Sequence, residues 1–279
     1  MKKYIFILLL CALTLNAEAK KKTLTILHTN DTHSTIMPFK EDVGDTMKAG
    51  RAGFLRRITM IEEQRKKSPN LLLFDSGDFS QGSSYYTMFG GEVEVELMNL
   101  MGYDAATIGN HEFDLGLENM AKIFRQAKFP IVCTNYDFRG TCVEGLVKQY
   151  IVIERDGIKI GVFGVSPRLN GLVSEKNCAG VKFIDPRHAA QVAVKHLKEK
   201  EGCDVIICLS HLGWDIKPDI DDNTLIPVCK DIDLVLGGHS HTYLEQLEWV
   251  KDAEGKPVPV DQNGKHGIFV GKIEMELTK

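Results

Sequence analysis

The chain has 279 residues, of which 43% are hydrophobic and 26% charged, and its formal net charge at pH 7 is −4. Because this charge is weak and spread along the chain, it offers no attraction for an anionic membrane surface, and no binding of duplex nucleic acid is expected. The length suits one sizeable core and is too short for two full domains.

The first nineteen residues have the pattern of a secretory signal peptide. Two lysines follow the initiator methionine, residues 4–15 are apolar, and residues 17–19 form a small-x-small cleavage site. The apolar run is too short to span a bilayer comfortably, and no later stretch is long enough. We expect cleavage after Ala19, export to the periplasm or the medium, and one domain over residues 20–279. Cys11 leaves a lipoprotein as a minor alternative.

Short β-branched runs alternate with amphipathic stretches, which is typical of α/β proteins built as one layered domain. The predicted strands are residues 23–28, 70–74, 105–109, 130–134, 150–153, 158–165, 204–210, 233–238 and 268–277. The predicted helices are residues 52–67, 117–128 and 186–201. Residues 91–102 are ambiguous, because Val93, Val95 and Leu97 alternate as in a strand. Val93, Leu97 and Met101 also recur at helical spacing, and we favour the helix.

Polar residues follow five of these strands at the point where each strand ends. The five segments are HTNDTHS (28–34), DSGDFSQG (75–82), GNHEFDLG (109–116), SHLGWD (210–215) and GGHSH (237–241). They contain six of the nine histidines, namely His28, His33, His111, His211, His239 and His241. Because reactive residues of α/β sheets lie in loops beyond the strand ends, we expect the five segments to surround one cleft.

Imidazole nitrogens and carboxylate oxygens form a ligand set for divalent transition metals, and neighbouring glycines let short side chains converge. Each pair alone also has a structural interpretation. Asp31 with His33 fits a turn, and Asn110 fits an asparagine turn beside a solvent-facing histidine. Five such elements at separate strand ends would require five coincidences, so we predict a metal site. A set without thiolate suits Zn, Mn, Fe or Co and does not distinguish among them.

The segment GGHSH places two histidines with a single serine between them. On an extended strand, residues i and i+2 point the same way, so His239 and His241 would serve one ion. Gly237 and Gly238 mark the end of the strand, however, so the two rings can diverge in the following loop. From the spacing alone, both arrangements remain open.

Six cysteines lie beyond the signal peptide, without paired zinc spacing or a small-scaffold disulfide framework. Cys133 with Cys142 is the one local pair worth testing. We expect most of the six to be buried as small apolar residues.

The five segments, in order and wording, resemble the calcineurin-like metallophosphoesterases. More narrowly, they resemble the metal-binding N-terminal domain of the 5′-nucleotidase/UDP-sugar hydrolase family. The resemblance covers nearly all of the chain after residue 19, including GKPVPV (255–260) and GIFVGKIEMEL (267–277). It implies an α/β fold in which a layered sandwich of two mixed β-sheets is flanked by helices (αββα).

Carried over residue by residue, the resemblance implies two divalent metal ions that share one carboxylate. The implied ligands are Asp31, His33 and His241 for the first ion, Asn110, His211 and His239 for the second, and Asp78 as the bridge. Two neighbouring cations can polarise a phosphoryl group and lower the pKa of a bound water, so that hydroxide attacks at neutral pH. The neutral oxygen of Asn110 limits the negative charge at the site. Asp75 is expected to support the metal ligands or a turn, and not to bind a metal itself.

The resemblance also implies that His111 and Asp114 act on the substrate. The carboxylate would orient the imidazole and favour its charged form, which stabilises phosphoryl oxygens and can protonate the leaving group. The structural alternative is that Asp114 caps a helix starting near Leu115. We favour the catalytic interpretation.

The remaining histidines receive structural interpretations. His28 is expected to pack or to support the site, His188 and His196 to lie on the solvent side of a helix, and His266 to be an ordinary loop residue.

Members of the family usually continue into a second domain that grips the nucleotide phosphate and stacks on the base, whereas this sequence stops at Lys279. The resemblance therefore implies catalytic machinery without these specificity elements. The expected substrate is a small-molecule phosphoester. Three possibilities remain: loose specificity, a separate polypeptide that supplies the missing half, or a substrate other than a nucleotide.

Two classes of function follow. The first is an exported two-metal phosphohydrolase acting on 5′-nucleotides or related phosphomonoesters, with a phosphodiesterase for cyclic nucleotides or nucleotide sugars as its variant. The second is a metal-binding or partner-binding module without turnover. The ligand set together with His111 and Asp114 favours the first, since a binding module needs no positioned acid.

Overall fold

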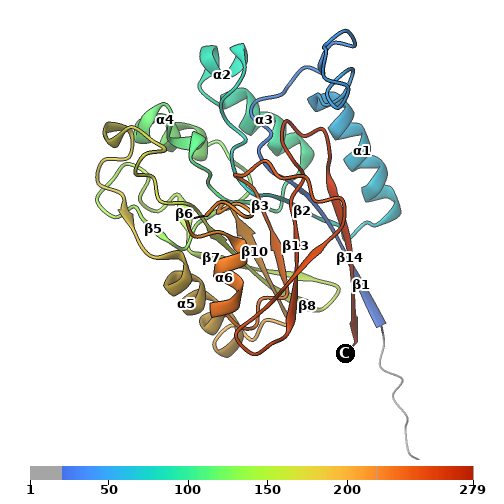
Figure 1. Cartoon of the computed structure of the whole chain (residues 1–279), viewed down its shortest axis with the longest axis vertical. Coiled ribbons are helices and arrows are strands. Elements are labelled where there is room, and N and C mark those ends of the chain that lie inside the picture. The colour runs from blue at the N-terminus through green and yellow to red at the C-terminus, as the bar shows by residue number, and fades with distance from the viewer. Residues whose placement is uncertain (1–20, 218, 279) are drawn as a thin grey trace, which may run out of the picture.

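The computed structural model describes residues 21–217 and 219–278, so the predicted signal peptide lies outside the described residues. The described chain forms two large β-sheets packed face to face, with helices on the outer face of each (Figure 1). The layered αββα sandwich expected for this chain is confirmed.

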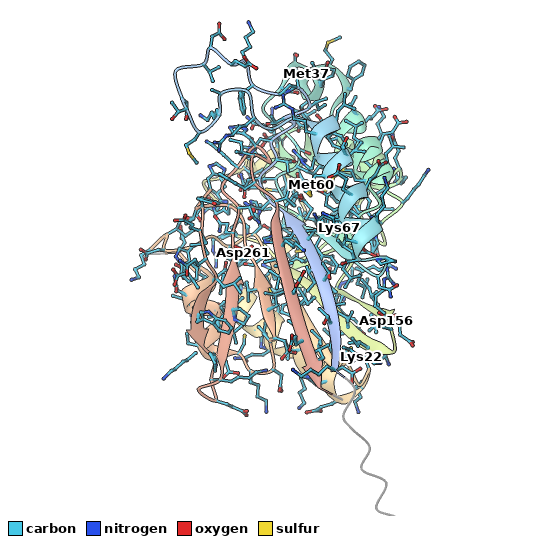
Figure 2. All side chains as sticks on the ribbon, turned by 90° about the vertical axis from the view of Figure 1, so that its right-hand side faces the viewer. Lys22, Met37, Met60, Lys67, Asp156 and Asp261 are labelled. Carbon is cyan, nitrogen blue, oxygen red and sulfur yellow. The ribbon has the colours of Figure 1, made fainter. Side chains whose placement is uncertain are left out.

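The first sheet has six strands in the order β14-β1-β2-β3-β4-β6. They are β1 (Lys21–Thr29), β2 (Leu72–Asp75), β3 (Ala105–Ala106), β4 (Ile131–Val132), β6 (Val147–Lys148) and β14 (Gly271–Thr278). β14 runs antiparallel beside β1 (Figure 2), and the other neighbouring pairs are parallel. Near the start of β1, Lys22 donates a hydrogen bond to the carbonyl oxygen of Asp156, which lies in a turn of the second sheet.

The second sheet also has six strands, in the order β12-β13-β11-β10-β8-β7. They are β7 (Tyr150–Arg155), β8 (Ile158–Val165), β10 (Val205–Ser210), β11 (Leu234–Leu236), β12 (Glu248–Lys251) and β13 (Pro257–Asp261). The four inner strands are parallel, and the two edge strands pair antiparallel with their neighbours. A small separate sheet pairs β5 (Tyr136–Asp137) with β9 (Lys182–Phe183).

The helices divide between the outer faces of the two sheets. α1 (Phe54–Lys67), α3 (Glu92–Met101) and α4 (Gly116–Phe124) share one buried cluster with the first sheet. α5 (Pro186–Glu199), α6 (Asp222–Leu225) and the 3₁₀ turn η3 (Ile226–Val228) share another with the second sheet. The short helix α2 (Ser84–Phe89) and the 3₁₀ turns η1 (His111–Phe113) and η2 (Glu175–Asn177) lie in loops.

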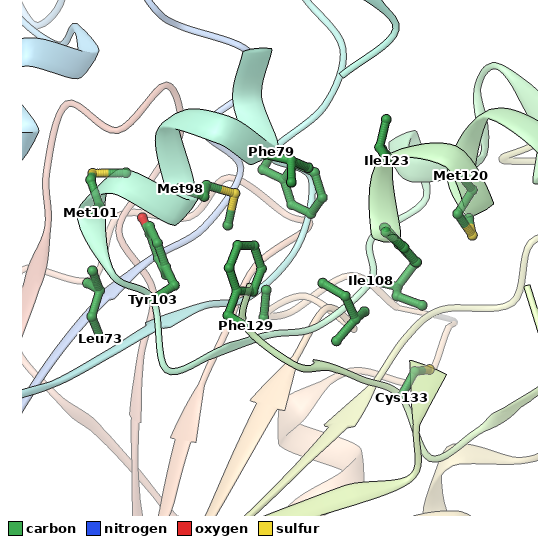
Figure 3. Packing of buried hydrophobic residues seen from close by; sticks show 14 of the residues in the cluster. Leu73, Phe79, Met98, Met101, Tyr103, Ile108, Met120, Ile123, Phe129 and Cys133 are labelled. Carbon is green, nitrogen blue, oxygen red and sulfur yellow. The ribbon is translucent and has the colours of Figure 1, made fainter. Parts of the chain in front are cut away.

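The packing under α3 illustrates the first of these clusters (Figure 3). Met98 of α3 lies near Phe79 and Phe129, and the rings of Phe129 and Tyr103 are 6.0 Å apart. This layer holds the helices against the first sheet and supports the loops that leave its strands.

The third cluster lies between the two sheets, and strand β10 shows how it forms. Ile207 and Leu209 belong to the inter-sheet cluster, whereas Ile206 and Cys208 pack on the α5 side. Successive side chains of a strand point to opposite faces, so a strand covered on both sides is apolar throughout.

Each of the nine predicted strands and four predicted helices overlaps an element of the predicted kind, including the ambiguous segment that forms α3. The extents differ most at β3 and β4, which have only two residues each. The sequence did not predict the elements α2, α6, β5, β6, β9, β12 and β13.

All six cysteines in the described part of the chain are free, so Cys133 and Cys142 do not form the disulfide considered from sequence. Four of the six are buried, as expected.

Within the same part of the chain, no helix is long and apolar enough to cross a membrane.

Candidate metal centre

Loops from both sheets meet at the carboxyl ends of their parallel strands. The backbone N–H of Asp31, after β1, donates to the carbonyl oxygen of Gly77, after β2. The hydroxyl of Ser76 donates to the carbonyl oxygen of Leu236 at the end of β11, at 2.7 Å. The convergence expected from the five polar segments is therefore present, and it joins the two sheets.

A first group of candidate ligands is formed by Asp31, His33 and His241. Asp31 Oδ1 lies 3.4 Å from His241 Nε2 and 3.8 Å from His33 Nε2. The two imidazole nitrogens are 2.9 Å apart. Asp31 Oδ2 is held in place, because it accepts hydrogen bonds from the backbone N–H of His239 and from the side chain of Asn30.

A second group is formed by Asp78, His211 and His239, whose candidate ligand atoms all lie within 4.8 Å of one another. Asp78 Oδ2 is 3.0 Å from His211 Nε2. His211 Nδ1 lies 2.6 Å from the carbonyl oxygen of Ser76 and must be the donor there, because a carbonyl oxygen only accepts. This hydrogen bond leaves Nε2 as the free nitrogen on the side of Asp78.

The loop after β3 brings Asn110 to the same place. His111, the next residue, donates its backbone N–H to Asp78 Oδ1 at 2.9 Å. Gly109, the residue before, approaches Asp78 so closely that an added Cβ would overlap the carboxylate. A glycine is therefore required at position 109, which explains why the segment GNH begins with one.

The two histidines of GGHSH diverge in the structure. The ring of His239 lies 5.1 Å from that of His211, whereas the ring of His241 lies 5.0 Å from that of His33. Of the two arrangements left open by the spacing, the geometry matches the divergent one.

Five of the seven candidate ligands have a left-handed backbone. Their φ values are 47° at Asp31, 42° at His33, 55° at Asp78, 73° at His239 and 56° at His241. Non-glycine residues rarely adopt this conformation, although Asp and His do so more readily than most, and such residues cluster at functional sites. The strand-end loops turn sharply here, and the turns aim the side chains inward.

Several polar atoms of this centre are buried and have no hydrogen-bond partner among the described residues. They are Asp31 Oδ1, His33 Nδ1 and Asn110 Oδ1. Since buried polar atoms are rarely left unpaired, such a cluster calls for a further binding partner. Carboxylate oxygen, amide oxygen and imidazole nitrogen are ligands for divalent cations, so the residues fit a metal centre.

The electrostatics are consistent with this fit. Burial lowers the pKa of both His33 and His239 to about 4, which favours the neutral imidazole that a metal requires. Burial also lowers the pKa of His211, but the carboxylates of Asp78 and Asp31 outweigh it and raise that pKa to about 10. A cation bound at Asp78 would take the place of this proton.

His111 and Asp114 form a pair beside the candidate ligands. His111 Nδ1 lies 2.8 Å from Asp114 Oδ2, and both side chains are about one-third exposed, at 30% and 31%. Burial lowers the pKa of His111, but the hydrogen bond to Asp114 and the charge of Asp78 raise it, and the net shift is upward. The residue before α4 is Leu115 and no side chain caps this helix, so the capping interpretation of Asp114 is wrong.

His111 is also close enough to be a metal ligand. Its candidate ligand atom lies within 4.8 Å of those of His33 and Asp78, which makes a third possible group. His33 and Asp78 thus each belong to two groups, so the groups are contiguous.

Glu112 is a buried residue of the centre that sequence reasoning missed. Its carboxylate accepts hydrogen bonds from the backbone N–H groups of Asp78 at 3.0 Å, Ser80 at 3.1 Å and Gly109 at 2.6 Å. Burial and the nearby charge of Asp78 raise the pKa of Glu112 to about 7. Its position inside GNHEFD was the only available signal, and the side chain ties two ligand-bearing loops together.

Of the remaining expectations, those for Asp75 and His28 are confirmed and that for His266 is wrong. Asp75 supports a turn as expected, since Oδ1 accepts the backbone N–H of Gly77. His28 is buried and pairs with Asp261 at 2.7 Å, so it packs as expected. His266 is no ordinary loop residue: its backbone N–H donates to the carbonyl oxygen of Asp31, and its ring lies 5.9 Å from that of His33. Only the fold brings the loop before β14 to this place.

The chain belongs to the calcineurin-like phosphoesterase family, whose model matches residues 24–243. Among curated proteins, it is 32% identical over 294 residues to the 5′-nucleotidase of Rattus norvegicus, covering 99% of this chain and 50% of that protein. It is also 32% identical over 284 residues to the trifunctional nucleotide phosphoesterase protein YfkN of Bacillus subtilis, covering 90% of this chain and 18% of that protein.

Among solved structures, the chain is similar to a 5′-nucleotidase precursor from Thermus thermophilus, with a TM-score of 0.82 and 32% identity. That match covers 91% of this chain and 51% of the other. The chain thus spans about half the length of the 5′-nucleotidases it matches.

Proposed function

We propose that this protein is a metal-dependent phosphohydrolase acting on 5′-nucleotides or related phosphomonoesters. The observation that carries the proposal is the pairing of two contiguous groups of candidate metal ligands with a hydrogen-bonded His111–Asp114 pair beside them. A metal-binding module would explain the first feature but has no need of the second.

Asp31, His33 and His241 would hold one divalent cation, Asn110, His211 and His239 a second, and Asp78 would bridge them. When bound, two such ions polarise a phosphoryl group and lower the pKa of a bound water. The arrangement of Asp78 supports a bridging role, because its Oδ1 and Oδ2 contact different residues, the backbone of His111 and the ring of His211.

The protein's own contribution to the chemistry centres on His111. Asp114 occupies Nδ1 of the imidazole, so Nε2 is the nitrogen available to a substrate. A protonated imidazole in this position would donate to a phosphoryl oxygen and can pass a proton to the leaving alcohol. Asp114 orients the ring and favours its charged form.

Nucleotides lead the substrate classes because the relatives at 32% identity are 5′-nucleotidases and a nucleotide phosphoesterase. We also propose that residues 1–19 direct export and that residues 20–279 act as the mature domain. Export predicts that the mature protein begins at Lys20, which mass spectrometry of the exported protein would check.

Replacing Asp114 by Asn tests the function. The variant keeps a hydrogen-bonding side chain but loses the charge that favours imidazolium, so kcat for a nucleoside 5′-monophosphate should fall by about 100-fold or more. The metal content of the variant, measured by elemental analysis, should equal that of the parent. Asp45→Asn is the control, because Asp45 is exposed and its carboxylate contacts Met47 and Lys48.

Substrate class is tested with a panel of nucleoside monophosphates, cyclic nucleotides, nucleotide sugars and sugar phosphates, each assayed with Mn²⁺, Zn²⁺ or Co²⁺. Metal-dependent hydrolysis of monoesters is the expected result. Turnover restricted to cyclic nucleotides or nucleotide sugars would replace the monoesterase by a phosphodiesterase. No turnover of any substrate, with full metal content, would leave only the binding module.

A further inference from the structure

A cavity of about 470 Å³ adjoins the candidate metal centre on the side of His239. It lies between the loop that follows β8 and the loop that follows β10. His239 is part of its wall, so a group bound at the metal centre would have the cavity directly beside it. Small-molecule sites in proteins have volumes of about 300–1,000 Å³, and this cavity falls in that range.

The walls of the cavity are mainly apolar. The apolar residues that line it are Pro167, Leu172, Phe183, Pro186, Leu212, Ile216 and Ile220. Such apolar walls suit a ring system.

Among the described residues that line the cavity, Arg168 is the one cationic residue, and its guanidinium carbon lies 4.5 Å from the centre of the Phe183 ring. A flat guanidinium over an aromatic ring forms a wall against which another flat ring can stack. Asn170 and Asp219 also line the cavity and provide hydrogen-bonding groups for the edge of such a ring.

Both loops that form the cavity are tied to the rest of the fold. The first is anchored where it leaves β8, because Asn135 donates to the carbonyl oxygen of Ser166 at 2.8 Å. Farther along this loop, Asn177 donates to the carbonyl oxygen of Asp114 at 2.7 Å, so the loop also contacts the catalytic pair. In the second loop, the backbone N–H of Trp214 donates to the hydroxyl of Ser240 at 2.9 Å. Farther along, Asp221 accepts the backbone N–H of Ile216 and caps α6. A cavity with anchored walls loses little entropy when it binds a ligand.

We propose that this cavity binds the ring system of the substrate's alcohol, which for a nucleotide is the base, while the phosphate lies at the metal centre. The inference rests on the proposed function and makes it more specific. It places base recognition within the metal-binding domain itself, with Leu172, Phe183 and Arg168 as specificity-determining residues.

The test compares adenosine 5′-monophosphate with ribose 5-phosphate. Both carry the phosphate on the 5′-oxygen of a ribose, so the ratio of their kcat/KM values reports the contribution of the base. Leu172 is 47% exposed, so Leu172→Asp puts a carboxylate into the cavity wall without disturbing the core. Arg168→Ala removes the stacked guanidinium. Leu100→Asp is the matched control, because Leu100 is 70% exposed on α3 and outside the cavity.

The parent should prefer the nucleotide, and the preference should fall by about tenfold in Leu172→Asp and in Arg168→Ala, as expected when a stacked ring loses its wall. The control should keep the parental ratio. A ratio that is unchanged in both cavity variants overturns the proposal, even if phosphatase activity is high.

A binding measurement separates failure of this proposal from failure of the proposed function. If the parent hydrolyses neither substrate, the phosphohydrolase proposal fails, and the cavity is judged by adenosine alone. Saturation-transfer NMR with chelator present should then show adenosine binding to the parent and to Leu100→Asp, and a loss of signal in Leu172→Asp. Equal signals in all three proteins, or none in the parent, would overturn the cavity assignment.

Discussion

At His239 and His241, the backbone φ angle decides which neighbouring residues each side chain contacts. Both residues have positive φ, so the alternation that would align their side chains on a strand does not apply. As a result, one ring lies beside His211 and the other beside His33.

This divergence predicts separate effects of the two histidines on metal content. The parent is expected to hold two ions per chain. His239→Ala and His241→Ala should each retain about one, because the affected site loses one of its four proposed protein ligands, the shared Asp78 included. Metal analysis after dialysis would measure this, with exposed His188→Ala as the control. Loss of both ions in each variant would instead indicate one shared site.

The hydrogen bonds of Glu112 predict that substitutions of this residue lower the stability of the fold as well as affect metal binding. In Glu112→Ala three buried backbone N–H groups lose their acceptor, which should lower the free energy of unfolding by about 3 kcal/mol or more. Glu112→Gln keeps one side-chain oxygen and should lose about half as much. Urea denaturation of the parent and both variants, each with chelator, gives the order of their stabilities. Equal stability of the three proteins would contradict a role of Glu112 in holding the two loops together.

At the scale of elements, the two sheets approach each other closely at Gly164 in β8. An added Cβ there would overlap the hydroxyl of Thr107 and the carbonyl oxygen of Val132. Thr107 directly follows β3 and Val132 lies in β4, so both belong to the first sheet. The hydroxyl and this carbonyl are themselves hydrogen-bonded at 2.8 Å. The glycine therefore permits the contact between the sheets that brings their loops together.

Gly164→Ala should lower the free energy of unfolding by about 1–3 kcal/mol, since the overlap is with backbone as well as side chain and cannot relax freely. The same substitution at Gly44 is the control, because its φ is not positive and an added Cβ there meets nothing within 4 Å. Thermal denaturation of both variants gives the comparison. An effect at Gly164 no larger than that at Gly44 would count against the close approach.

The elements predicted from sequence are those with long, uninterrupted patterns. The eight residues of β8, most of them apolar or β-branched, form the strand over the range predicted, 158–165. β3 and β4 have two residues each, and β12 and β13 lie in a stretch with prolines and charges, where periodicity is weak. Pairing with neighbouring strands, which a local pattern does not contain, decides where these elements begin and end.

At the scale of the whole molecule, the candidate ligands come from five loops that belong to both sheets. A cation bound there would connect these loops, and a ligand that binds only the folded state raises its stability. At 100 times Kd the gain is about 2.7 kcal/mol, which corresponds to about 5–10 °C in Tm for a domain of this size.

Chelation of the metal-loaded protein should therefore lower Tm by about this amount, and added Mn²⁺ or Zn²⁺ should restore it. Circular dichroism at 222 nm would follow the transition. Asp78→Asn, which loses the bridging charge, should respond much less to the chelator. Identical Tm values with and without chelator in the parent would contradict a metal centre that joins the sheets.

Local patterns in the sequence predicted the layered α/β class, most of the strands and helices, and the gathering of histidines and carboxylates at strand ends. These features depend on local periodicity and on residue chemistry, which neighbouring residues carry. The packing of the two sheets set the remaining features: the divergence of His239 and His241, the hydrogen bonds that Glu112 accepts from two loops, the nearness of His266 to His33, and the cavity between two loops. Each of these depends on left-handed turns or on contacts between residues far apart in the chain, and such contacts exist only once both sheets have packed.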